Sequence, residues 1–312
     1  MHPRRLAWCL AAVALVVSAC VGAPAGGSIV SPAPSPSSGP SSGSPAPSPS
    51  RGPAGTGGLI FRVAYVGGFI APNASRTQLP LVSVYSDGRI ITQGATPAIY
   101  PGPLLPTLVV RSVGSTGAAA ILRAAVDAGL AGADTTYPPA PPPDAPMTVI
   151  TVIHDSQRTV STFGLLAPAG GQPVDSGLAG GGAVEQVRAA SAALVTRLMS
   201  NDNFGGPAGP DGTYAPQGFR LFVTPGSPAP SDPQLARPPV AWPLATPLAS
   251  FGRPDSLGGD GARTGDVVGP DSATLGPILA AATQITPFSS GGKQWTIFVR
   301  PLFPDEVAAL GG

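Results

Sequence analysis

A proline-rich stretch near the N-terminus limits how much of this chain can fold. Residues 22–58 consist mostly of Gly, Pro, Ser and Ala and contain short Ser-Pro-Ala-Pro-Ser-Pro runs. Such a composition buries too little apolar surface to offset the conformational entropy that is lost on ordering. We therefore expect a disordered linker over 20–58, reaching between about 35 Å as a flexible coil and about 110 Å fully extended. The folded domain is expected at 59–312.

The first twenty residues have the parts of a secretory signal. Arg4 and Arg5 form a basic start, residues 6–17 are apolar, and a pair of small residues follows. The apolar run is too short for a membrane-spanning helix, which needs about 20 such residues. The cysteine at position 20 is chemically suited to acylation, because a thiolate is nucleophilic enough to form a thioether.

Val17, Ser18, Ala19 and Cys20 resemble the lipobox of bacterial lipoproteins, which has an aliphatic residue, two small residues and a cysteine. The resemblance implies that 1–19 is a lipoprotein signal peptide and that Cys20 becomes an N-terminus carrying diacylglycerol and palmitate. Such a protein is held by its acyl chains at the extracytoplasmic face of the cell membrane. The alternative is an ordinary cleaved signal with a chance cysteine.

Charge and cysteine content bound the partners of the domain. The formal charge is +1 and becomes about −1 once Arg4 and Arg5 leave with the signal (1 − 2), so nucleic acid is not expected as a partner. The second cysteine, Cys9, lies inside the signal. Cysteine spacing therefore indicates neither a disulfide framework nor a metal site, and no cofactor is expected.

Periodicity predicts an α+β domain: an antiparallel sheet with two or three helices packed on it, and long Pro/Gly-rich loops. Asp87-Gly88 between two alternating apolar runs predicts a hairpin, and residues 147–163 predict a second one. Helices are expected at 115–128 and 183–200, with a possible third at 272–284. Strands are also expected at 59–66, 107–113, 218–223 and 293–300, whereas regular structure is not expected over most of 225–270.

Three sequence patterns of this region resemble secreted proteins of unassigned function from high-GC Gram-positive bacteria. The patterns are Tyr-Ser-Asp-Gly-Arg at 85–89, a helix ending in Gly-Leu at 129–130, and Val-Arg-Pro-Leu-Phe-Pro-Asp-Glu at 299–306. The resemblance implies no activity and no catalytic residues.

Few residues suggest chemistry. His154 is the only histidine after the signal, and a surface position beside a turn is the simpler interpretation. Spaced loop carboxylates could serve a hydrolase or bind calcium, but their spacing of five to six residues does not match a calcium loop. Solvated loop positions explain them better; they are Asp255, Asp260, Asp266 and Asp271.

Aromatic residues late in the chain suggest either a binding surface or a core. Trp242, Phe251 and Trp295 would form an apolar contact surface if they were exposed. Alternation of Trp295 with Ile297 and Val299 favours a core face instead.

The leading hypothesis is a lipid-anchored, non-enzymatic binding or interaction domain with a cell-wall or protein partner. One alternative is a cell-envelope hydrolase that uses the carboxylates between Asp255 and Asp271, with or without His154. The other is a structural envelope protein.

Overall fold

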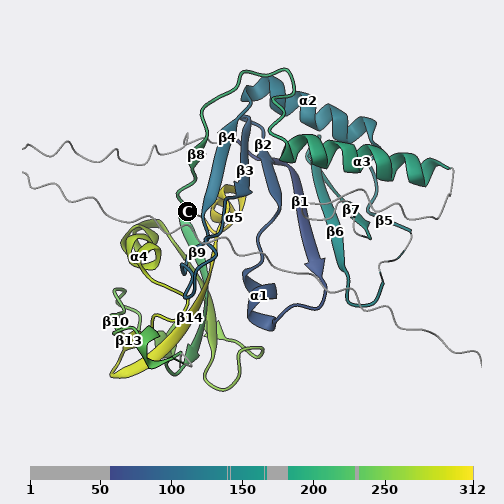
Figure 1. Cartoon of the computed structure of the whole chain (residues 1–312). Helices are drawn as coiled ribbons and strands as arrows, with labels where there is room; N and C mark the ends of the chain where they lie inside the picture. The colour runs from purple at the N-terminus through teal and green to yellow at the C-terminus, as the bar shows by residue number, and fades with distance from the viewer. Residues whose placement is uncertain are drawn as a thin grey trace, which may run out of the picture. The chain divides into compact units, whose positions relative to one another are not determined.

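The computed structural model describes residues 57–138, 140, 142–164, 166, 182–228 and 232–311. Two predicted segments lie outside these ranges: the signal peptide and nearly all of the linker. The lipobox residues outside them are Val17, Ser18, Ala19 and Cys20. In the described residues the chain forms helices and two mixed sheets, so the prediction of a domain with both helices and sheet is confirmed (Figure 1).

The first sheet, called sheet 1 below, has eight described strands. Neighbouring strands are antiparallel except for one parallel pair at the edge, β5 with β7. In spatial order they are β5 (Thr135–Tyr137), β7 (Gln157–Phe163), β6 (Pro146–His154), β1 (Leu59–Gly67), β2 (Val82–Tyr85), β3 (Arg89–Gln93), β4 (Leu108–Ser112) and β8 (Gly212–Thr213).

Two hairpins organise sheet 1, and both were predicted. β2 and β3 are joined through Ser86, Asp87 and Gly88, and Gly88 has a φ of 88°. β6 and β7 are joined by Asp155 and Ser156, whose φ values of 49° and 65° are those of a type I′ turn. The backbone twist of a type I′ turn matches the right-handed twist of the two strands that it connects.

One face of sheet 1 shares a hydrophobic core with α2 (Gly114–Asp127) and α3 (Ala183–Met199). Figure 1 shows both helices crossing the strands next to each other. In each helix, buried residues are spaced three or four positions apart, as Ile121 and Ala125 are in α2 and Leu194 and Leu198 are in α3. Each helix therefore presents one apolar stripe to Phe61 and the rest of this core.

The second sheet, called sheet 2 below, has six described strands, and one parallel pair, β10 with β13, lies at its edge. Its core includes Leu275 and Leu279 of α4 (Gly269–Ala281) together with Trp295 of β14. In spatial order the strands are β10 (Val240–Ala241), β13 (Phe288–Ser290), β14 (Lys293–Pro301), β9 (Gly218–Pro225), β12 (Arg263–Val268) and β11 (Arg253–Pro254).

The described chain therefore corrects the expectation of a single antiparallel sheet. The region 225–270, expected to be irregular, contains β12, whose whole length pairs with residues 218–223 of β9. Gly265 and Asp266 disfavour a strand in isolation, but Asp266 lies directly opposite Arg220 of β9 and forms an ion pair with it. Pairing across the sheet outweighs the local preference.

Candidate functional site

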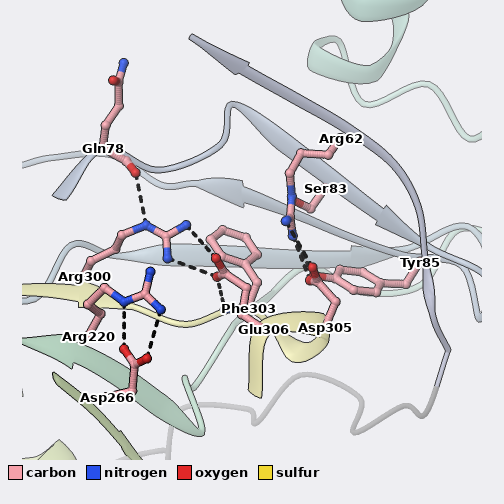
Figure 2. A network of polar contacts seen from close by, with 10 residues as sticks. All are labelled: Arg62, Gln78, Ser83, Tyr85, Arg220, Asp266, Arg300, Phe303, Asp305 and Glu306. Carbon is pink, nitrogen blue, oxygen red and sulfur yellow. Dashed lines mark hydrogen bonds and ion pairs between the residues drawn. The ribbon is translucent and has the colours of Figure 1, made fainter. Parts of the chain in front are cut away.

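A polar cluster lies where sheet 1 meets the C-terminal segment (Figure 2). Asp305 lies in the first turn of α5 (Pro304–Ala309) and accepts two hydrogen bonds from the Arg62 guanidinium of β1, at 2.7 and 3.0 Å. The Tyr85 hydroxyl of β2 donates to the same carboxylate at 2.8 Å. Residues separated by more than 200 positions in sequence thus share one carboxylate.

The same segment is tied to β14. Arg300 pairs with Glu306 at 2.9 Å, and its Nε donates to the Gln78 carbonyl oxygen at 3.2 Å. The Glu306 carboxylate also accepts from the backbone N–H of Phe303 at 2.9 Å. Phe303 itself is fully buried against the second face of sheet 1, together with Tyr85. This cluster joins the two sheets.

Burial shapes the electrostatics of this cluster. Burial, reinforced by the neighbouring Asp305 carboxylate, raises the pKa of the Tyr85 hydroxyl far above its usual value, so this tyrosine stays a hydrogen-bond donor. Burial alone would lower the pKa of Arg62, but the charge of Asp305 and its hydrogen bonds raise it overall. Each arginine of the cluster has a carboxylate partner, so the cluster presents little free charge.

Two further ties join the sheets. Arg76 of α1 (Pro72–Thr77) forms an ion pair with the buried Asp255 carboxylate, and its guanidinium lies 4.3 Å from the centre of the Phe222 ring. The loop between β3 and β4 pairs with the segment after α4 through an antiparallel bridge of Pro103 with Thr283. The two sheets are therefore linked at several separate points.

A cavity of about 470 Å³, called the junction cavity below, opens between these ties. Part of its wall is apolar and is formed by Tyr65 of β1, Leu104, Met199 at the end of α3, and Val299 of β14. Three glutamines from three separate segments line it as well; they are Gln78, Gln93 and Gln284.

The glutamine amides make the junction cavity chemically distinctive. Neither a donor nor an acceptor of the three side-chain amides has a hydrogen-bond partner among the residues that the structure describes. Each amide offers two donors and one acceptor oxygen. Among the described residues that line it there is no Asp, Glu, Lys or Arg. The junction cavity can therefore form hydrogen bonds with a ligand without neutralising any charge on it.

A second cavity of about 350 Å³ shares Tyr65, Gln78 and Leu79 with the first. It is lined by the side chains of Arg62 and Arg300, both already paired within the polar cluster. An anionic ligand would have to compete with Asp305 and Glu306 for these guanidinium groups. We therefore treat the junction cavity as the candidate site.

The carboxylates singled out from the sequence do not gather. Asp255 pairs with Arg76, and Asp266 pairs with Arg220 at 2.7 Å. Asp260 lies exposed in a turn, and Asp271 lies exposed in the first turn of α4. In the described ranges, no group of three or more His, Cys, Asp or Glu side chains is arranged to hold a metal ion.

His154 ends β6 beside a turn and is partly exposed, with Nδ1 3.5 Å from the carboxylate of the adjacent Asp155. Its surroundings are those of a surface turn, and it lines neither of the two cavities described above.

The three predicted aromatic contact residues lie in and against the core of sheet 2. Phe251 is 6% exposed and Trp295 is 4% exposed, whereas Trp242 is only partly buried. The Trp242 ring meets Phe251 and Phe288 edge-on, with ring centres 6.0 and 6.4 Å apart. The alternation along β14 thus corresponds to a core face, and these rings do not form an open aromatic surface.

The candidate site was missed in the sequence. Its three glutamines are uncharged, belong to no motif and are spread over about 200 residues, so only the paired sheets bring them together. No family model, curated protein or solved structure matches the chain. The described helices include none with the length and apolar character needed to cross a bilayer.

Proposed function

We propose that this chain is a lipid-anchored binding protein of the bacterial cell envelope, held by acyl chains on Cys20 at the extracytoplasmic face of the membrane. The 20–58 segment would let the domain at 59–312 reach away from the bilayer, and the junction cavity would hold an envelope component. The proposal assigns no catalytic step to the domain. It also assigns the fold to the α+β class, because antiparallel pairs dominate both sheets.

One observation supports binding over the alternatives: three glutamines from separate segments line one cavity that also has apolar walls. Apolar surface with a few well-placed polar groups is typical of ligand sites, and about 470 Å³ lies within their usual range of roughly 300–1,000 Å³.

The anchor is tested by replacing each cysteine of the signal region in turn. Cys20→Ala should abolish palmitate labelling and the diacylglyceryl mass on the N-terminal peptide, because no other cysteine follows the signal. Cys9→Ala is the matched control and should be labelled like the wild type. Labelled Cys20→Ala protein, or a wild-type N-terminus other than an acylated Cys20, would refute the anchor.

Binding is tested by sedimentation with insoluble envelope polymer from the native host. The full-length protein, solubilised in a zwitterionic detergent, should co-sediment, and Gln93→Leu with Gln284→Leu should reduce the bound fraction at least fivefold. Gln294→Leu on the exposed side of β14 is the control and should bind normally. If the wild-type protein stays in the supernatant, the binding function is wrong.

A further inference from the structure

The chemistry of the junction cavity points to one class of ligand. We infer that the junction cavity binds a neutral oligosaccharide, with the amides of Gln78, Gln93 and Gln284 contacting sugar hydroxyls. This inference rests on the proposed binding function and goes further by naming the kind of molecule bound.

The absence of charge in the lining argues for a neutral ligand. In the described part of the chain, no carboxylate, lysine or arginine contributes to the wall. Burial raises the pKa of Tyr65, which keeps its hydroxyl neutral. A charged ligand entering such a site would lose hydration without gaining a counter-charge, which is costly. The nearest arginine side chains, in the neighbouring cavity, are already paired with Asp305 and Glu306.

The glutamine amides match the pattern of hydroxyl groups on a sugar. A hydroxyl both donates and accepts, and a side-chain amide offers both functions on one planar group. The hydroxyl of Thr96 adds a fourth group of the same kind to the lining. Because Gln78, Gln93 and Gln284 come from three segments, they can contact different edges of one ring or neighbouring rings.

The apolar part of the lining matches the other half of a sugar. Pyranose rings present faces of C–H groups, which lose little hydration free energy when they leave water. Leu79, Leu81, Leu104 and Val299 provide aliphatic surface for such a face, and Met199 adds a flexible side chain that is 44% exposed. A ligand with polar edges and apolar faces therefore suits this cavity better than a fully apolar one.

An extended peptide is the alternative occupant. Peptides in extended conformation are usually bound by adding a strand to an open sheet edge. At the junction cavity, Tyr65 of β1 pairs only with β6, and Val299 of β14 pairs only with β9. The three glutamines of the lining favour the sugar, and the capped tripeptide used below tests the peptide.

The experiment exposes labelled full-length protein, in lauryldimethylamine oxide, to an array of neutral and acidic glycans. This detergent carries no sugar group that would compete. The best neutral glycan and a capped neutral tripeptide, acetyl-Ala-Ala-Ala-amide, are then titrated by calorimetry. We expect the neutral glycan to bind with Kd between about 10 μM and 1 mM, and acidic glycans and the tripeptide to bind at least tenfold more weakly.

Variants locate the site. Gln93→Leu with Gln284→Leu should weaken glycan binding at least tenfold, because both amides are lost while both positions are exposed enough to keep the fold. Gln294→Leu should leave Kd unchanged. Preference for acidic glycans or for the peptide, no binding to any neutral glycan, or full binding by the double variant would each overturn the inference.

The sedimentation assay separates this failure from that of the proposed function. If the wild-type protein co-sediments with envelope polymer in a glutamine-dependent way but binds no neutral glycan, binding stands and the saccharide is wrong. If both assays fail, the binding function fails with the inference.

Discussion

At the scale of single residues, Gly88 is a position with little freedom to change. Its φ of 88° is in the left-handed region, and a Cβ there would collide with the carbonyl oxygen of Gly114, at the start of α2. The Val113 N–H also donates to the Gly88 carbonyl oxygen at 2.9 Å. The hairpin turn between β2 and β3 therefore serves as a docking point for the first turn of α2.

We predict that Gly88→Ala lowers the free energy of unfolding by at least about 2 kcal/mol, because backbone strain adds to a steric clash. Gly67→Ala is the matched control. Gly67 also has a positive φ, 76°, but has open space around it, so only the conformational cost of about 1 kcal/mol applies. Urea denaturation measures both, and equal losses would show that the contact with Gly114 contributes nothing.

The same turn shows which properties of a residue can be predicted from local sequence. Asp-Gly predicted the hairpin correctly, and of these two residues only Gly88 has a positive φ. Asp87 instead accepts hydrogen bonds from the backbone N–H groups of Gly57 and Arg89, at 3.1 Å each. The turn follows from local conformational preference, whereas the contacts with Gly57 and Gly114 depend on the folded neighbours.

At the scale of elements, the end of α3 depends on a side chain from sheet 1. Arg111 of β4 is 6% exposed and donates to the carbonyl oxygens of Leu198 and Asp202, each at 3.0 Å. The last carbonyl groups of a helix lack partners within it, and a cation also interacts favourably with that end of the helix dipole. Arg111 therefore holds the C-terminus of α3, beside the junction cavity, against the sheet.

We predict that Arg111→Met lowers the free energy of unfolding by about 2–3 kcal/mol, since two carbonyl groups lose a charged donor. Arg123→Met, at an exposed position of α2, is the control and should change it by less than about 0.5 kcal/mol. Thermal unfolding followed by circular dichroism gives both values. A similarly small change in unfolding free energy at both positions would mean that water can replace Arg111 as the hydrogen-bond donor to the carbonyl groups at the end of α3.

Elements with strong periodicity were predicted well. The helices expected at 115–128 and 183–200 occur at 114–127 and 183–199. Val113 precedes the first of these helices, and no side chain caps its start. The third helix begins at Gly269, before the expected start, and contains Pro277. The sequence predicted its apolar character but not where the preceding strand ends.

At the scale of the whole described domain, the two sheets are held together by side chains. Asp305 connects α5 to β1 and β2, Asp255 connects sheet 2 to α1, and Leu104 inserts from the β3–β4 loop into the core of sheet 2. These ties join two cores that contain few residues in common. We therefore expect the sheets to unfold together in the wild-type protein and to separate when a tie is removed.

The tryptophans allow a direct test. Trp242 and Trp295 belong to sheet 2, and the third tryptophan, Trp8, lies in the predicted signal. Tryptophan fluorescence therefore reports on sheet 2, whereas far-ultraviolet circular dichroism reports on both sheets. We predict coincident urea transitions for the wild type and for Asp260→Ala, an exposed control, but separated transitions for Asp305→Ala. Coincidence in Asp305→Ala would show that the other ties suffice.

The arrangement of the sheets is the part that sequence reasoning did not reach. Local patterns identified most strands, but not that β1 pairs with β6 while β14 pairs with β9. Gln93 ends an ordinary strand and Gln284 follows a helix, and neither position carries a local signal of function. Their proximity arises only from long-range pairing, so the candidate site became visible with the fold.

The direction of β1 has a mechanical consequence. β1 starts at Leu59, where the predicted linker ends, and Tyr65 near its other end lines the junction cavity. If the chain is tethered to the bilayer and holds a wall polymer there, tension between the two passes along this strand. β1 pairs with β2 over Leu59–Val63 and with β6 over Phe61–Gly67, so the load would shear these rows of hydrogen bonds and would not open them one by one.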